Sequence, residues 1–205
     1  LKQPFTVTLG TSNYRAGVNA GNSIASGGNY NVTVGDEAGT AITTGDNNVA
    51  VGYTAGDAIT TGIDNVFIGA NAGSALIDSD FNVAVGKVAL DADTKGSKST
   101  AVGHATLTDQ NFSTATDSHN TAVGYAAGGA VTTGQYNTFV GSTSGDAVTD
   151  ADENVAVGYN SLSTNTLGNR AVAIGTGALA TMNFTTATDS GNTAVGQAAG
   201  NAVTT

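Results

Sequence analysis

The sequence predicts an all-β protein, a parallel β-solenoid built from coils of about 17 residues each. Three observations lead to this prediction. A glycine that closes a "VG" phrase recurs at regular intervals, an asparagine recurs four positions before it, and Val, Ile, Thr and Ala fill the positions between them. Regular recurrence of one short phrase is the signature of a repeat array, in which each unit packs only on its neighbours.

The glycine series sets the length of one coil. Seven of its ten steps equal the seventeen positions from Gly35 to Gly52, the first is eight positions longer, and two are four positions longer. The series is Gly10, Gly35, Gly52, Gly69, Gly86, Gly103, Gly124, Gly141, Gly158, Gly175 and Gly196. At about 3.3 Å per residue, two short strands and two turns use up one such step and return the chain to a point above its start. We therefore expect two strands in each coil, "NVAVG" and "AITT", and a rod on the order of 50 Å long at about 4.8 Å per coil.

Two columns of identical residues are expected to run along the rod. The asparagine column is interrupted only by Ser99 and Ala171, and its members are Asn31, Asn48, Asn65, Asn82, Asn120, Asn137, Asn154 and Asn192. Such a column predicts an in-register ladder of amide hydrogen bonds. The glycine column predicts corners where φ is positive or where another backbone comes close.

The strand "NVAVG" is apolar on both faces, because Val49 and Val51 point to one side and Ala50 to the other. A solenoid strand has one face toward its own interior, so the second apolar face is expected to be covered by another molecule. The simplest cover is a second copy of the same chain, in a cyclic homo-oligomer. On this basis Val85 and Val102 are expected to lie in buried columns.

The repeat array is predicted over residues 32–205, after an atypical entry coil over residues 1–31. In the entry coil "AGNSIASG" matches the later phrase "AGDAITTG" but follows an unmatched stretch, "TSNYRAGVN". Terminal repeats of solenoids are usually atypical. The array itself ends in mid-coil at "NAVTT", and we expect the chain to be a segment of a longer fibre.

Two coils are four positions longer than the rest, and their extra segments match each other. These are "TDQNFSTATDSHN" over residues 108–120 and "TMNFTTATDSGN" over residues 181–192, which lie four coils apart. They are expected to leave the same side of the rod. Loops on a rigid scaffold often bind partners, whereas a single Phe in a loop often acts as a packing clamp. Both interpretations stay open for the candidate residues Phe112, Thr114, Asp117, Phe184, Thr186 and Asp189.

The composition excludes several classes of partner. Sixteen acidic residues against six basic ones give a net charge of −10, which disfavours nucleic acid. No apolar run approaches the length of about 18 residues that indicates a membrane span. The chain has no cysteine, so neither disulfides nor thiolate chemistry is expected.

We expect no cofactor and no enzymatic activity. Acidic pairs such as Asp78 and Asp80 leave Ca²⁺ as an alternative, but the spacing is not that of an EF-hand. A hydrolytic triad could be drawn from Ser113, Asp117 and His119, yet the second long loop has Gly191 at the histidine position. An ice-binding solenoid is a further alternative, because Thr pairs recur at Thr43/Thr44, Thr60/Thr61, Thr132/Thr133 and Thr204/Thr205, although other coils interrupt the array.

The phrases "NVAVG" and "RAVAIG" resemble repeats in the head domains of trimeric autotransporter adhesins, and "NTAVGYAAGGAVTTGQY" (residues 120–136) is similar to repeats of phage tail fibres. The resemblance implies a left-handed parallel β-roll, a homotrimer of chains side by side, and an extracellular location. It implies a phage tail fibre shaft or head that takes part in binding a host receptor. The expected partners are neighbouring fibre or virion proteins and a host cell-surface glycan or protein. A bacterial adhesin head and a carbohydrate-active fibre enzyme are the alternatives.

Overall fold

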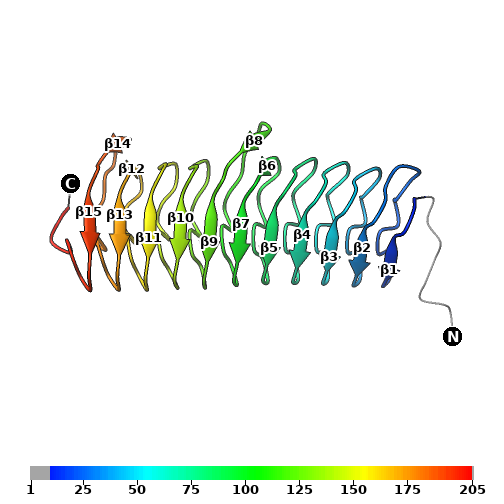
Figure 1. Cartoon of the computed structure of the whole chain (residues 1–205), viewed down its shortest axis with the longest axis horizontal. Helices are drawn as coiled ribbons and strands as arrows, with labels where there is room; N and C mark the ends of the chain where they lie inside the picture. The colour runs from blue at the N-terminus through cyan, green and yellow to red at the C-terminus, as the bar shows by residue number, and fades with distance from the viewer. Residues whose placement is uncertain (1–9, 205) are drawn as a thin grey trace.

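The computed structural model describes residues 10–204, which form one straight stack of coils with the first and last strands, β1 and β15, at opposite ends of the rod (Figure 1). Each coil contributes one three-residue strand to an 11-stranded sheet. Its strands are β1 (Tyr14–Ala16), β2 (Val32–Val34), β3 (Val49–Val51), β4 (Val66–Ile68), β5 (Val83–Val85), β7 (Thr100–Val102), β9 (Thr121–Val123), β10 (Thr138–Val140), β11 (Val155–Val157), β13 (Val172–Ile174) and β15 (Thr193–Val195). The described residues form no helix, so none of them provides a helical membrane span.

The strands pair in parallel and in register. Ala50 of β3, for example, lies opposite Phe67 of β4, one regular repeat step later in the chain. The step is four positions longer where a long loop intervenes, as between Thr100 of β7 and Thr121 of β9. The predicted parallel solenoid with seventeen-residue coils is confirmed.

The second predicted strand of each coil does not form. The "AITT" segment runs as turns, and its backbone groups bond to the next coil instead, as when Thr43 N donates to Thr60 O at 2.9 Å. The preceding residues explain this difference, because Thr54 and Gly56 have φ of 50° and 54° and bend the chain out of the extended conformation. The solenoid is thus held by one sheet on one side and by stacked turns on the other.

The glycine column has both properties predicted for it. Gly52 has φ of 137°, and a Cβ atom placed on it would lie 2.6 Å from the carbonyl oxygen of Gly69 in the next coil. Only glycine fits such a corner. The assignment of the first coil was wrong, because Gly17, with φ of 141°, occupies the column in place of Gly10. The unmatched stretch of the entry coil therefore contains a regular strand, β1, in which Tyr14 pairs with Val32 of β2 at one position more than the regular step.

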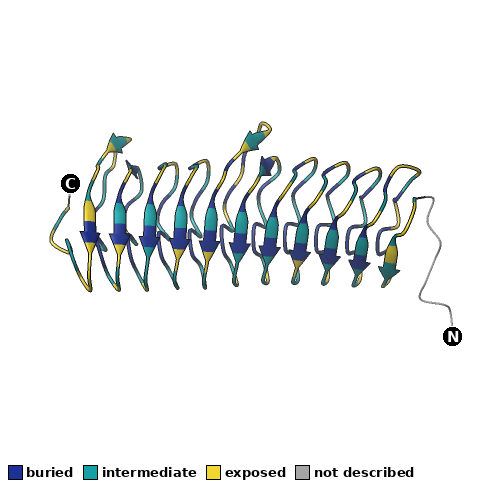
Figure 2. Ribbon diagram, in the orientation of Figure 1, coloured by how far each residue is buried: buried dark blue, intermediate teal, exposed yellow. Residues whose placement is uncertain are grey.

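The core is a narrow column of side chains from the centres of the strands and from the turns. In the 11-stranded sheet from β2 to β15, Figure 2 shows a buried part of each strand next to less buried neighbours. From β3 to β13 the central residue is fully buried and is Ala, except for Phe67 and Phe139. Ile42, Ile59 and Leu76 from the turns complete the core.

The asparagine ladder is buried and forms as predicted from Asn31 to Asn154, whereas Asn192, also predicted in it, is only partly buried and donates from Nδ2 to Met182 Sδ at 3.2 Å. The Oδ1 of Asn48 accepts from the backbone N–H of Asn65 at 3.1 Å, and its Nδ2 donates to the carbonyl of Gly62 at 2.8 Å. The Oδ1 bond recurs at every asparagine of the column from Asn31 to Asn154. The Nδ2 bond recurs at each of them except Asn154, whose Nδ2 donates to Asn137 Oδ1 at 3.2 Å. Because unpaired buried backbone groups cost about 1–3 kcal/mol each, the ladder fixes the height of one coil on the next.

Candidate binding surface at the long loops

The two long loops leave the same side of the rod, as predicted, and rise above the other coils (Figure 1). Each loop carries a two-residue strand that pairs with the preceding coil. In the first loop β8 (Thr116–Asp117) pairs with β6 (Gly96–Ser97), and in the second β14 (Thr188–Asp189) pairs with β12 (Gly168–Asn169). These pairings give both loops a defined backbone shape.

The two loop phenylalanines lie at the base of their loops, against the rod. Phe112 is 5% exposed, and its ring approaches Gly96 so closely that a Cβ atom there would lie 3.0 Å from it. Phe184 is partly buried against the core, and its ring stands in the same relation to Gly168, at 2.6 Å. This packing fits the clamp interpretation for the phenylalanines, and it leaves the tips of the loops as the surface available to a partner.

A buried polar cluster supports the first loop. The carboxylate of Asp93 accepts from Gln110 Nε2 at 2.6 Å and from the backbone N–H groups of Gly96 and Phe112. Gln110 Oε1 in turn accepts from Asn120 Nδ2 at 2.8 Å. Burial raises the pKa of Asp93, against these hydrogen bonds, which lower it. Ser99, which stands in the ladder before Asn120, has no side-chain amide oxygen. Gln110 Oε1 therefore acts as the amide acceptor for Asn120 Nδ2 in this coil.

Sequence reasoning missed this cluster, although a signal for it is present. Asp93 and Gln110 stand in the column of turn residues that holds Ile42, Ile59 and Leu76 in other coils. A carboxylate in an apolar column needs buried donors. At the corresponding positions the second loop has buried Asn165 and Met182. The Asn165 side chain donates to the carbonyl of Gly168 and accepts from its backbone N–H.

The other predicted loop residues are exposed. Thr114 and Thr186 lie at the tips of the loops. Asp117 and Asp189 follow them, and each pairs with a basic residue of the coil below, Asp117 with Lys98 at 2.5 Å and Asp189 with Arg170 at 2.5 Å. Exposed pairs of this kind contribute at most about 1 kcal/mol to stability, so their main effect is to orient the carboxylates.

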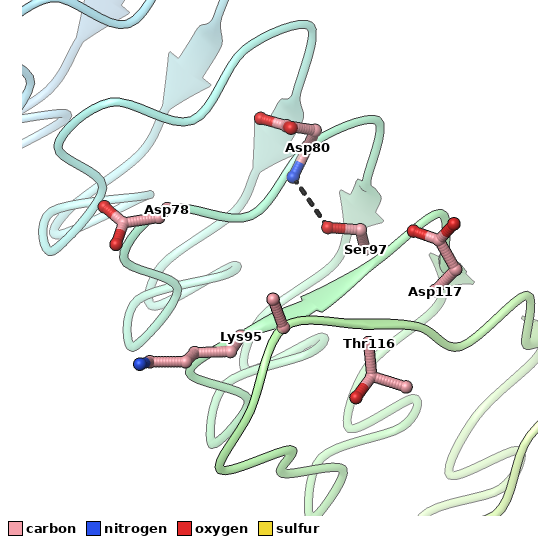
Figure 3. Close-up of a pocket in the computed structure, with 7 residues that line it drawn as sticks. Asp78, Asp80, Lys95, Ser97, Thr116 and Asp117 are labelled. Carbon is pink, nitrogen blue, oxygen red and sulfur yellow. Dashed lines mark hydrogen bonds between the residues drawn. The ribbon is translucent and has the colours of Figure 1, made fainter.

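A hollow of about 460 Å³ lies beneath the first loop (Figure 3). Its lining combines three carboxylates, one ammonium group and two hydroxyl groups, from Asp78, Asp80, Lys95, Ser97, Ala115, Thr116 and Asp117. Two of the carboxylates are held from one side only: Asp78 Oδ1 accepts from Thr60 and Thr61, and Asp80 Oδ1 from the backbone N–H of Ile63. Within residues 10–204 no hydrogen bond reaches the Oδ2 atom of either one.

The remaining sequence hypotheses meet different geometry. Asp117 bonds to Lys98 and His119 stacks on Tyr136 at 5.2 Å, so the triad with Ser113 is not assembled. The hydroxyls of Thr60 and Thr61 are bonded to Asp78 rather than arrayed on a flat strand. Over the described range, no three His, Asp or Glu side chains gather as a metal site.

The outer face of the 11-stranded sheet is a second candidate surface. Its Val and Ile side chains are only partly covered, with Ile68 40% and Val140 37% exposed. Val85 and Val102, expected in buried columns, are likewise half-buried in the single chain, so only contact with another molecule would complete their burial. All six tyrosines of the chain are exposed, and most of them border these strands: Tyr14, Tyr30, Tyr53, Tyr125, Tyr136 and Tyr159.

Comparison with known proteins adds no relative. No protein-family model, curated protein or solved structure matches the chain. The function is therefore argued from the two surfaces alone.

Proposed function

We propose that this chain is a structural segment of an extracellular fibre, that it assembles side by side as a homotrimer, and that it takes part in attachment to a host cell. The observation that carries the proposal is the outer face of the sheet. It presents a continuous apolar strip, from β2 to β15, on a rod that has no other large apolar surface among its described exposed Val, Ile, Tyr and Phe residues.

The shape of this strip favours a second copy as its cover. Identical rods can place equal strips against each other over their full length, which a compact partner cannot do. Apolar surface contributes about 25 cal/mol per Å² when it leaves water, and aromatic residues such as Tyr53 and Tyr159, each 60% exposed, are typical of interface cores. Parallel rods with the same face inward close into a ring about one axis.

Within this proposal the fibre is a phage tail fibre, and a bacterial adhesin head is the second candidate. The length of the coils and the two loops favour the tail fibre, because the adhesin heads that the repeats resemble have shorter coils. The partners would be adjoining fibre or virion proteins at the ends and a cell-surface glycan or protein at the loops. The proposal assigns the chain no catalytic step and no cofactor.

A charge on the outer face tests the assembly. In the double substitution Val85→Asp/Val102→Asp, both side chains remain half in water in a single chain, so the coils should stay folded. A trimer would have to bury unpaired carboxylates, at several kcal/mol each. We expect light scattering to give three times 20.0 kDa for the natural chain and one chain mass for the variant.

Thr44→Asp is the matched control, because Thr44 is exposed on the turn side of the rod. It should keep the trimer mass. A natural chain that is a stable monomer in dilute solution would contradict the proposal, as would a Val85→Asp/Val102→Asp chain that still forms trimers.

A further inference from the structure

Residues 49–120 and 121–192 are two copies of one four-coil unit, identical at about half of their positions. The pairs Phe67/Phe139, Leu90/Leu162 and Phe112/Phe184 show the match. The two copies allow the structure to be compared with itself, position by position. The inference drawn from this comparison rests on the proposed function and names the ligand of the loops.

The loop tips are retained between the copies while their buried supports differ. Residues 114–118 and 186–190 read "TATDS" in both, and most of these side chains are exposed. Beneath them, the buried pair Asp93 and Gln110 becomes Asn165 and Met182. Packing alone constrains a buried support more than an exposed tip. The reverse pattern indicates that the tip surface itself is required.

Most of the residues that line the hollow beneath the first loop are retained in the second copy. Five of its seven lining residues have identical counterparts in the second copy: Asp78/Asp150, Asp80/Asp152, Ala115/Ala187, Thr116/Thr188 and Asp117/Asp189. The two differences are Lys95, which becomes Leu167, and Ser97, which becomes Asn169. The chemistry common to both loops is therefore carboxylates and Thr hydroxyls, without the ammonium group.

The retained carboxylates are also held by the same bonds. Asp150 accepts from Thr132 and Thr133, as Asp78 does from Thr60 and Thr61. Asp152 accepts from the backbone N–H of Gln135 at 2.7 Å, the counterpart of the bond from Ile63 to Asp80. The backbone N–H of Asp152 donates to Asn169 Oδ1 at 2.9 Å, where that of Asp80 donates to Ser97 Oγ at 3.0 Å. Even the substituted position thus preserves the placement of the carboxylate; Figure 3 shows the bond of the first copy, from Asp80 to Ser97.

We propose that both long loops bind the same ligand class, a neutral glycan rich in hydroxyl groups. Carboxylate oxygens that are fixed on one side and open on the other accept hydrogen bonds from neighbouring hydroxyls, and charge-assisted bonds of this kind are stronger than neutral ones. The Thr116 and Thr188 hydroxyls donate to the carbonyls of Thr114 and Thr186, each at 3.0 Å, so they add further acceptors for the ligand's hydroxyls. An acidic glycan is disfavoured as the common ligand, because the one cation that the loops share, Lys98 and its counterpart Arg170, is paired with Asp117 and Asp189, on a chain with net charge −10.

The spacing of the loops makes the binding bivalent. Four coils at about 4.8 Å each place the two tips roughly 19 Å apart on the same side of the rod. Two weak sites on one rigid body act at a high effective concentration toward a repetitive surface. A dense array of one cell-surface glycan would therefore be held more tightly than a single copy in solution.

The test is the double substitution Thr116→Val/Thr188→Val, which removes one hydroxyl from each site and keeps the shape of the side chain. The natural chain and the variant are applied to a glycan array that carries neutral, sialylated and sulfated oligosaccharides. We expect the natural chain to bind neutral members and the double variant to lose at least about tenfold in apparent affinity, since bivalency multiplies two losses. Each single substitution should give an intermediate loss, and Thr44→Val, an exposed Thr elsewhere on the rod, should give none.

Three results would overturn the inference: preference for sialylated or sulfated glycans, binding that the double substitution leaves unchanged, or no binding to any glycan by a correctly folded natural chain. The molecular mass from light scattering is measured on the same samples. A trimer that ignores the array contradicts the glycan inference and leaves fibre assembly standing, whereas a monomer contradicts the proposed function itself.

Discussion

Leucine occupies a backbone conformation that usually belongs to glycine at four places in the core. Leu90, Leu107, Leu162 and Leu179 have φ between 48° and 53°, in the column that holds glycine in the other coils. The left-handed conformation costs such a residue about 1–2 kcal/mol, and burial of a leucine side chain offsets this by about 1.5–3 kcal/mol. The four leucines lie in coils whose strand centre is Ala, where there is room for them.

The glycines of the same column flank the two core phenylalanines. A Cβ atom on Gly56 or Gly73 would lie 2.5 Å from the ring of Phe67, so a leucine could not fit there. Large residues thus alternate between the strand and the turn. In the sequence, Phe in the strand goes with Gly in the turn, and Leu in the turn goes with Ala in the strand. This relation can be recognised only after the structure has shown that the two columns face each other.

Protonation of Asp93 gives a prediction at the residue scale. Because burial raises its pKa above the ordinary 3.8, the folded state binds this proton more tightly than the unfolded state does. The contribution of Asp93 to folding is therefore most favourable below pH 3.8 and is lost as pH rises through the folded-state pKa. Asp93→Asn should remove this dependence.

The measurement is the free energy of unfolding by denaturant at several pH values, natural chain minus Asp93→Asn. Subtraction cancels the other carboxylates whose pKa burial raises, Asp57 and Asp146. We expect the difference to become less favourable to the natural chain from acidic to neutral pH. A difference that is constant over this range would show that Asp93 ionises equally easily in both states.

At the scale of the element, a coil is one three-residue strand and a long series of turns, and the coils at the long loops add the two-residue strands β6, β8, β12 and β14. Strands such as β3 could be predicted, because alternating Val and Ala between Asn and Gly leave few alternatives. The absence of the "AITT" strand could not, because the left-handed residues before it include Thr54, Val88 and Ala126, which have no propensity for that conformation. Their φ angles follow from stacking on the coil below, where Thr54 N donates to Asp36 O, and single-coil propensities do not contain that information.

The loops could be predicted as matched protrusions, but it could not be predicted which of their residues pack against the rod and which face solvent. Phe112 and the residues at the tip are neighbours in sequence, yet one is 5% exposed and the others lie in water. Only the pairing of β8 with β6 determines which side faces the rod. The packing of Phe112 fits the clamp interpretation, and the binding proposal concerns the exposed tip residues of the same loop.

Truncation of the loop phenylalanines separates these roles. Phe112→Ala should destabilise the first loop and the coils beside it by about 3 kcal/mol, the usual cost of a buried Phe. Phe184→Ala should cost less, because Phe184 is only partly buried. Thermal unfolding followed by circular dichroism ranks the two variants. Equal and negligible shifts in Tm would contradict the clamp role.

At the scale of the whole molecule, the rod has one apolar side and one loop-bearing side. The sheet buries its inner face in its own core and exposes Val and Ile on its outer face, while β8 and β14 project from the turns (Figure 1). In the proposed assembly through the sheet the loops would stay free, so that each side could be changed without disturbing the other.

Lateral assembly makes a prediction about dimensions as well as mass. Each chain is a rod of eleven coils, on the order of 50 Å at about 4.8 Å per coil. If three rods lie side by side, the trimer has a larger cross-section than the single chain but the same length. If copies join end to end through the edges of β1 and β15, the particle lengthens threefold and the cross-section stays constant.

Small-angle X-ray scattering from the natural chain and from Val85→Asp/Val102→Asp measures both quantities, and the chain termini contribute equally to the two samples. We expect the maximum dimension to agree within about one or two coils and the cross-sectional radius of gyration to fall in the variant. A natural particle about three times as long as the variant would show that the sheet face is not the interface, because stacking of the open ends would then account for the oligomer.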